Sequence, residues 1–315
     1  MRPLPRDLLL LGLCLVLAVL PVSAAPQYVV SLVLFVFMFI ALAESWNLLS
    51  GYTGYVSFGH VVFFGVGAYT TAITMTRWGL AWLPASLLGG VAAVGLALLI
   101  GYPCLRLKGP YFAISMLGLS EVVRLLALYL EPLTGGGMGI SRIRPPTPDP
   151  TPVVYWAMEA MAVLVVAVTY AIDRAQFGLR LKSIREDELA AEAMGINTTA
   201  YKMYAFLLSA FFPGIVGGIH AYYLSYIEPD STFALLYTIN MAIMTIFGGR
   251  GTVWGPVIGA VTLYLVSEAV WVRFPFLHLV LFGLVIMIVV LFMPRGVLGW
   301  IATRRPRLVP AGKEL

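Results

Sequence analysis

The feature that most constrains this chain is the repetition of long apolar runs. A run of about 20 residues with few charges is long enough to cross the hydrocarbon core of a bilayer as a helix. A helix satisfies all of its backbone groups within one segment, as an environment without water requires. Hydrophobic residues make up 60% of the 315 residues and charged residues 11%, against about 25% in soluble proteins. The sequence therefore predicts an all-α, polytopic transmembrane helical bundle, with residues 1–315 forming a single domain.

Nine apolar segments and one glycine-rich segment predict about ten spans. The glycine-rich one covers residues 50–72, and the apolar ones cover residues 8–20, 28–49, 84–104, 111–130, 153–172, 203–224, 233–247, 255–272 and 276–293. The first follows Arg2 and Arg6 and precedes small residues, which is also the pattern of a cleaved signal peptide. We expect a retained helix, because the rest of the chain is also embedded in the membrane. A cleaved signal remains the alternative.

The basic residues predict the orientation of these spans. Ten crossings place both termini on one side, and that side holds 15 of the 20 Lys and Arg residues. The other side holds four, and Arg124 lies within a span. Cytoplasmic loops of membrane proteins carry such an excess of Lys and Arg. We therefore expect a multi-pass protein of the cell (inner) membrane, in contact with membrane lipid, with both termini in the cytoplasm.

One long polar segment, RAQFGLRLKSIREDELAAEAMGINTTAYK at residues 174–202, interrupts the apolar pattern. Its charges cannot lie in hydrocarbon, because each costs roughly 2.5–3.5 kcal/mol at the centre of a spanning helix. The orientation makes it a cytoplasmic loop. Residues 184–194 are predicted to form one short helix of about 15 Å, too short to span the bilayer, which ends at Gly195. An ordinary solvated helix and a docking surface for a soluble partner both fit this pattern.

Five glycines fall within seventeen residues of the stretch SGYTGYVSFGHVVFFGVGAYTTA at residues 50–72. Such a density permits close helix packing and also broken helices. A broken helix is tolerated at membrane depth only inside protein or beside a wet cavity, where its free backbone groups can bind a polar solute. Tight packing is one interpretation, and a wall of a translocation path is the other. The candidate path residues are Asn47, Gly51, Gly54, Ser57, Gly59 and His60.

A second glycine-rich stretch, FGGRGTVWGPVIGA at residues 247–260, is similar in outline to the first. The two are predicted to form a parallel internal repeat that enters the membrane from the cytoplasmic side. The Gly- and Pro-rich loop at residues 131–152 is predicted to be external, as a connector or as part of a docking surface for an external protein. Glu121 and Arg124 lie three residues apart on one predicted helix, and this spacing favours a structural pair.

The sequence lacks the common motifs of ATPases and enzymes. It contains no GxxxxGK[ST], GxSxG, HExxH or CxxC pattern. Three His and two Cys residues leave little basis for a metal site. We therefore expect no catalytic residue, no metal, no cofactor and no enzymatic activity. The basic residues are scattered among loops, so we expect no nucleic-acid partner.

Three motifs, in this order, resemble the LivM type of membrane permease subunit in branched-chain amino acid ABC importers. They are NLLSGYTGYVSFGHVVFFGVGAYTTA, IREDELAAEAMGINTTAYKMYAFLLSAFFPGIVGG and FGGRGTVWGPVIGA. The resemblance implies a permease domain that moves leucine, isoleucine or valine into the cytoplasm. It implies a second (LivH-like) permease subunit, two cytoplasmic ATP-binding subunits and an external solute-binding protein as partners. Permeases of this family also move urea, short amides or other amino acids, and the sequence does not decide which of these solutes is carried.

Residues 188–195, ELAAEAMG, are similar to the loop that contacts the ATPase in ABC importers. Glu188, Ala191 and Gly195 fall on the E, A and G positions of that loop. The resemblance thus implies an ATPase-coupling role for Arg185, Glu188, Ala191, Glu192 and Gly195. A stand-alone secondary transporter or channel is the alternative from another class, and it would carry solute without ATP.

Overall fold

The structure is a computed structural model that describes residues 26–143 and 150–274, together with four residues between 280 and 287. The predicted span at residues 8–20, most of the one at 276–293 and three prolines of the predicted external loop lie outside the described residues.

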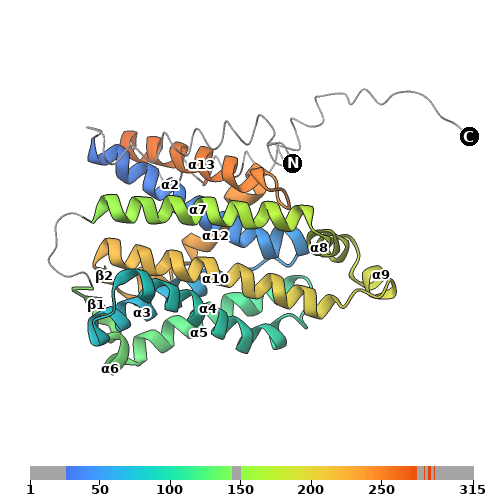
Figure 1. Cartoon of the computed structure of the whole chain (residues 1–315), viewed down its shortest axis with the longest axis horizontal. Helices are drawn as coiled ribbons and strands as arrows, with labels where there is room; N and C mark the ends of the chain where they lie inside the picture. Colours follow the sequence, from blue (N-terminus) through green and yellow to red (C-terminus); the bar gives the residue numbers. More distant parts are fainter. Residues whose placement is uncertain (1–25, 144–149, 275–279, 281–282, 285–286, 288–315) are drawn as a thin grey trace, which may run out of the picture.

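Long helices that run side by side make up most of the described chain (Figure 1). They are α2 (Gln27–Trp46), α3 (Val61–Trp78), α4 (Trp82–Cys104), α5 (Pro110–Tyr129), α7 (Thr151–Arg174), α10 (Thr198–Leu224), α12 (Leu235–Gly248) and α13 (Trp254–Arg273). In the described part, seven helices are long and apolar enough to cross a membrane, and α3 is not one of them. Threonines and Arg77 lower the apolar character of α3. The helical class is confirmed, whereas the total of ten spans stays a prediction.

Short elements lie at the two opposite ends of the bundle (Figure 1). One end carries α8 (Gln176–Glu186) and α9 (Glu188–Ala193), and the other carries α6 (Glu131–Thr134), β1 (Ile140–Ser141) and β2 (Tyr226–Ile227). The remaining short elements are the π-helical turn η1 (Asn47–Gly51), the 3-10 turn η2 (Gly136–Met138) and α11 (Pro229–Thr232). Strands β1 and β2 form one antiparallel pair. We call the end that carries α8 and α9 the α8–α9 end, and the end that carries β1, β2 and α6 the β-pair end.

The single helix predicted at residues 184–194 is wrong. The backbone leaves the helical region at Asp187 (φ −155°, ψ 111°), so α8 ends before it and α9 begins after it. The Oδ1 atom of Asp187 accepts hydrogen bonds from the N–H groups of Leu189 (2.9 Å) and Ala190 (3.0 Å). An aspartate satisfies the free donors of a helix start in this way. Gly195 then follows α9 with a positive φ of 82°, which ends the helix.

Glycines allow α3 and α10 to touch backbone to backbone. A Cβ atom on Gly67 would lie 1.9 Å from the carbonyl oxygen of Gly214, and one on Gly217 would lie 2.0 Å from that of Phe64. No side chain fits at either position. The packing interpretation of the glycine-rich stretch is therefore confirmed at Gly67.

This close approach predicts that Gly67→Ala destabilises the protein, because its methyl group overlaps a backbone atom that cannot move aside. We expect a loss of about 1–3 kcal/mol of folding free energy. The measurement is the midpoint of thermal unfolding in detergent, which should be lower for this variant. Gly95→Ala in α4 is the matched control, since a Cβ there meets nothing within 4 Å. Equal midpoints for the two variants would contradict the packing described here.

Candidate functional site

The helix that begins as α2 ends near the α8–α9 end, and an irregular segment separates it from α3. It passes through the π-helical turn η1, and the backbone then lacks regular structure from Gly54 to Gly59 before α3 begins at Val61. Gly54 has a positive φ of 79°, which favours glycine. The broken helix that the glycine density allows is thus present. The helix predicted at residues 50–72 is shifted toward the C-terminus, to α3.

Side chains satisfy the backbone groups that this interruption frees. The indole Nε1 of Trp46 donates to the carbonyl oxygen of Ser57 (2.8 Å), and the N–H of Ser57 donates to Ser50 Oγ (3.2 Å). The N–H of Val61 donates to Thr238 Oγ1 on α12 (2.9 Å). An unbonded backbone group inside a membrane protein costs several kcal/mol. These bonds therefore make the irregular segment stable.

The two glycine-rich stretches meet at Asn47. Its Oδ1 accepts from the N–H of Gly251 (2.8 Å), and its Nδ2 donates to the carbonyl oxygen of Thr252 (2.9 Å). Asn47 is fully buried. A Cβ on Gly51 would lie 2.8 Å from the nitrogen of Gly251, so the two backbones need glycine to approach this closely. The prediction that the two stretches form an internal repeat is not tested by these contacts.

Arg185, the penultimate residue of α8, joins the polar loop to both stretches. Its Nη1 donates to the carbonyl oxygen of Gly51 (3.1 Å). A Cβ on Gly251 would lie 2.3 Å from that same Nη1, and one on Gly54 would lie 3.1 Å from Arg185 Cγ. The three motifs that stand far apart in the sequence therefore come together around one guanidinium group.

A second junction, which we call the Lys202 cluster, consists of Tyr55, Glu188 and Lys202. The Nζ of Lys202 donates to Glu188 Oε1 (2.6 Å), to Tyr55 OH (3.0 Å) and to the carbonyl oxygen of Leu105 (3.4 Å). The hydroxyl of Tyr55 donates to Glu188 Oε2 (2.7 Å). Only 4% of the Lys202 side chain and 15% of the Glu188 side chain are exposed. The cluster thus ties α9, α10 and the irregular segment to one another.

The charge state of the cluster follows from its contacts. Burial alone would raise the pKa of Glu188, but the hydrogen bonds from Lys202 and Tyr55 and the charge of Lys202 outweigh it, so this pKa lies below its ordinary value. The pKa of Tyr55 is raised, first by burial and then by its hydrogen bond to Glu188. At neutral pH the cluster therefore contains a carboxylate and a neutral phenol.

A third junction holds Tyr52, which lies between the other two in the sequence. Its hydroxyl donates to Asp173 Oδ1 (2.9 Å), and that same oxygen accepts from Lys182 Nζ of α8 (2.6 Å). Residues 51–55 are consequently bonded at three points to the region between the end of α7 and the start of α10.

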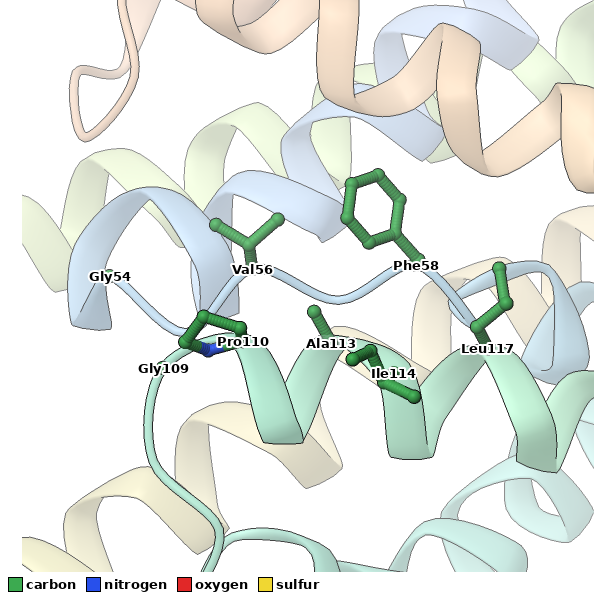
Figure 2. A pocket seen from close by; sticks show the side chains of 8 residues that line it. All are labelled: Gly54, Val56, Phe58, Gly109, Pro110, Ala113, Ile114 and Leu117. Carbon is green, nitrogen blue, oxygen red and sulfur yellow. The ribbon is translucent and has the colours of Figure 1, made fainter.

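An open apolar groove of about 510 Å³ lies between the irregular segment and α5 (Figure 2). Its lining residues are Gly54, Val56, Phe58, Gly109, Pro110, Ala113, Ile114 and Leu117. In the part of the chain that the structure describes, no group of three or more His, Cys, Asp or Glu side chains is placed to hold a metal ion.

Comparison with known proteins decides the family. A family model described as the permease component of the branched-chain amino acid transport system matches residues 28–290. The chain belongs to this family. It is therefore a permease, and the seven long apolar helices among its described residues indicate a multi-pass membrane protein.

Relatives of this permease include two proteins named high-affinity branched-chain amino acid transport system permease protein LivM. The one from Salmonella typhimurium is 29% identical over 83% of this chain and 68% of its own length. The one from Escherichia coli is 28% identical over 93% and 75%. The nucleoside ABC transporter permease protein NupC of Lactococcus lactis subsp. cremoris is 37% identical over 30% of this chain and 28% of its own length. No solved structure matches the permease.

Most of the predicted path residues lie inside the permease. Ser57 and His60 are fully buried, and the His60 Nε2 lies 3.0 Å from the carbonyl oxygen of Ser209 on α10. A Cβ on Gly59 would lie 1.9 Å from the carbonyl oxygen of Met116. Gly54 alone of the predicted six lines the groove. Contact of any of them with solute stays a prediction.

The predicted coupling residues lie close together in and beside α9. Arg185 and Glu188 bond inward to the segment after η1, as described above. Ala191 is 4% exposed, so it faces the permease. Glu192 accepts a hydrogen bond from Thr198 Oγ1 of α10 (2.6 Å), and Gly195 closes the turn. Their role toward an ATPase stays a prediction.

The sequence analysis missed the residues that hold α9 to the bundle. Lys202 was assigned to the solvated loop, yet α10 begins at Thr198 and buries it. A lysine four residues into a helix whose remainder is apolar is a signal for a buried partner. Tyr52 and Tyr55 carried no signal that distinguishes them from other tyrosines.

The Lys202 cluster predicts a strong coupling between its charges. Lys202→Met leaves the Glu188 carboxylate without its cation, and we expect a loss of about 3 kcal/mol of folding free energy. The double variant Lys202→Met/Glu188→Gln should recover a large part of this loss, measured as a double-mutant cycle of thermal unfolding. Glu186→Gln is the control, because Glu186 is 75% exposed and its pair with Arg185 contributes little. Additive effects of the two single changes would contradict the cluster.

The same carboxylate predicts a pH dependence. Because the folded pKa of Glu188 is lowered, its stabilising contribution is complete above the ordinary Glu pKa and is lost as pH falls through the folded value. Unfolding midpoints measured on a descending pH series should fall less steeply for Glu188→Gln than for the unchanged protein. Parallel curves would show that Glu188 contributes no such term.

Proposed function

We propose that this permease is one membrane subunit of an ATP-binding-cassette importer that moves leucine, isoleucine or valine into the cytoplasm. The names of the LivM relatives and the family match support this proposal. The chain has no nucleotide-binding motif, so separate ATP-binding subunits would supply the energy. Two such subunits, a second LivH-like permease and an external solute-binding protein complete the proposed assembly. The chain itself would be a single permease domain.

The observation that carries the proposal is the way α9 is held. Its inner face bonds to the permease through Glu188 and buries Ala191. Two large apolar side chains are exposed here, Leu189 in α9 (68% exposed) and Met194 directly after it (83% exposed). We infer that α9 is the coupling helix and that the ATP-binding subunit covers Leu189 and Met194.

Motion of α9 would reach the membrane interior through the junctions described above. Arg185 bonds to Gly51, and Glu188 bonds to Tyr55. A displacement of α9 by the ATP-binding subunit would therefore displace the segment after η1, which forms one wall of the open groove. This is the proposed route from ATP hydrolysis to the solute path, to which Gly54 and its neighbours belong.

The proposed orientation places the α8–α9 end in the cytoplasm. The hydroxyl of Tyr28 donates to Glu268 Oε1 (3.1 Å), so the start of α2 lies beside the last turns of α13, and both lie toward the β-pair end. One further crossing before α2 and one after α13 would return both termini to the cytoplasm. Together with α3 this gives ten spans. The β-pair end would then face the solute-binding protein.

The alternatives concern the solute and the mechanism. The match to NupC, although limited to 95 residues, leaves other polar solutes as alternatives. Urea, short amides and other amino acids are further alternatives. A stand-alone secondary transporter or channel would need no ATP.

Vesicles that contain this permease, its sister permease, both ATP-binding subunits and the binding protein should accumulate leucine only when ATP is present. Uptake by the permease alone on an ion gradient would contradict the proposal.

The coupling helix generates a sharper prediction. Leu189→Asp and Met194→Asp place a charge on the proposed ATPase contact, so ATP-driven uptake should be lost while the amount of inserted protein is unchanged. Met138→Asp is the matched control for ATPase binding alone, because Met138 is 86% exposed at the opposite end of the bundle, which is proposed to face the solute-binding protein. Pull-down of the ATP-binding subunits from detergent should fail for the first two variants and succeed for the third. Retained pull-down with Leu189→Asp and Met194→Asp would show that α9 is not the contact.

A further inference from the structure

One stripe along α5 joins the apolar groove to a group of charged side chains. Ile114 and Leu117 line the groove. Glu121 and Arg124 follow Leu117 at positions i+4 and i+7, and residues at this spacing share one face of a helix. The stripe therefore changes from apolar near the α8–α9 end to ionic near the β-pair end.

The charged group extends to a second element. Arg124 Nε donates to Glu121 Oε2 (3.0 Å), and the Arg124 guanidinium also pairs with Asp230 of α11. Side-chain exposures are 25% for Arg124, 55% for Glu121 and 74% for Asp230. Two carboxylates thus share one guanidinium, which leaves a net negative charge and carboxylate surface open to the outside of the chain. We call these three residues the Arg124 cluster.

The charges on this face of α5 disfavour contact with lipid. Glu121 lies eight residues before the end of α5 at Tyr129, or about 12 Å along the helix. Charged side chains at such depth face protein or a wet cavity rather than hydrocarbon. The irregular backbone at residues 54–58, on the other side of the groove, obeys the same restriction. Both features favour protein or water over lipid as the neighbour of this face.

The chemistry of the stripe matches an aliphatic amino acid. A free amino acid carries an ammonium group, a carboxylate group and, for leucine or valine, a branched apolar side chain. Glu121 and Asp230 offer acceptors for the ammonium group, Arg124 offers donors for the carboxylate group, and the groove offers an apolar surface for the side chain. Leu117 and Glu121 are about one helical turn apart, so one small molecule can reach both parts.

We propose that this stripe of α5 is a wall of the solute path, where the Arg124 cluster receives the charged end of the amino acid and the groove receives its side chain. This proposal rests on the importer function proposed above. It assigns the Arg124 cluster to solute recognition, in addition to the structural pairing that the sequence spacing predicts.

Cysteine accessibility tests whether the stripe faces water. In a variant with Cys14→Ser and Cys104→Ser, single changes Ile114→Cys and Leu117→Cys are compared with Leu99→Cys on α4, where Leu99 is 76% exposed. A charged, water-soluble methanethiosulfonate reagent is added to the assembled importer in vesicles. Residues 114 and 117 should react at least about tenfold faster than residue 99, because the reagent attacks the thiolate, which forms in water.

Leucine, added with its binding protein and ATP, should slow the reaction at residues 114 and 117. Reaction no faster than at residue 99 would overturn the proposal, and so would reaction that leucine leaves unchanged. Neither result would affect ATP-driven uptake by the unaltered importer, so failure of this proposal is distinguishable from failure of the importer function.

Asp230→Asn tests the recognition step with little structural cost, because the side chain is largely exposed. The apparent KM for leucine uptake should rise about tenfold, the effect of losing one charge-assisted hydrogen bond, while the midpoint of thermal unfolding is unchanged. Glu131→Gln is the control, since Glu131 is an exposed carboxylate at the same end and outside the cluster. The same KM for both variants would overturn the assignment of Asp230.

Discussion

The structure depends on satisfying the backbone that the interruption between α2 and α3 exposes. Each freed group that we describe has a side-chain partner, such as Trp46 for the carbonyl of Ser57 and Thr238 for the N–H of Val61. Membrane proteins tolerate irregular backbone only under this condition. The partners come from α2, α12 and the polar loop, so the interruption also fixes how these distant elements meet.

This requirement links the fold to the proposed function. Because Arg185 satisfies Gly51 and the Lys202 cluster holds Tyr55, residues 51–55 are hydrogen-bonded to α8 and α9. A displacement of α9 at the surface would therefore also displace residues 54–58, which lie beside the groove. A permease without a nucleotide site needs such a connection, since force must enter it through a protein contact.

Local sequence patterns predicted the helical class, most spans and the Glu121–Arg124 pair, because each depends on residues that are close in the chain. They allowed the broken helix as one of two interpretations of the glycine density. They did not predict the meeting of the glycine-rich stretches, since no local pattern connects Asn47 with Gly251, 204 positions away. The break at Asp187 had a signal, an N-cap residue before a helix, but the helix-favouring residues on both sides outweighed it. Lys202 was assigned to solvent because a charged side chain is not expected in the interior unless its partners, here Tyr55 and Glu188, are known.

The most direct measurement of the central claim is the distance between α9 and the irregular segment during the ATP cycle. Spin labels at Ala193 of α9 and at Phe58, both exposed, report this distance in the assembled importer, and a third at Met138 marks the opposite end. If α9 and the segment move as one unit, the 193–58 distance stays constant between the nucleotide-free and ATP-trapped states, while both distances to residue 138 change. A change in the 193–58 distance would contradict the account.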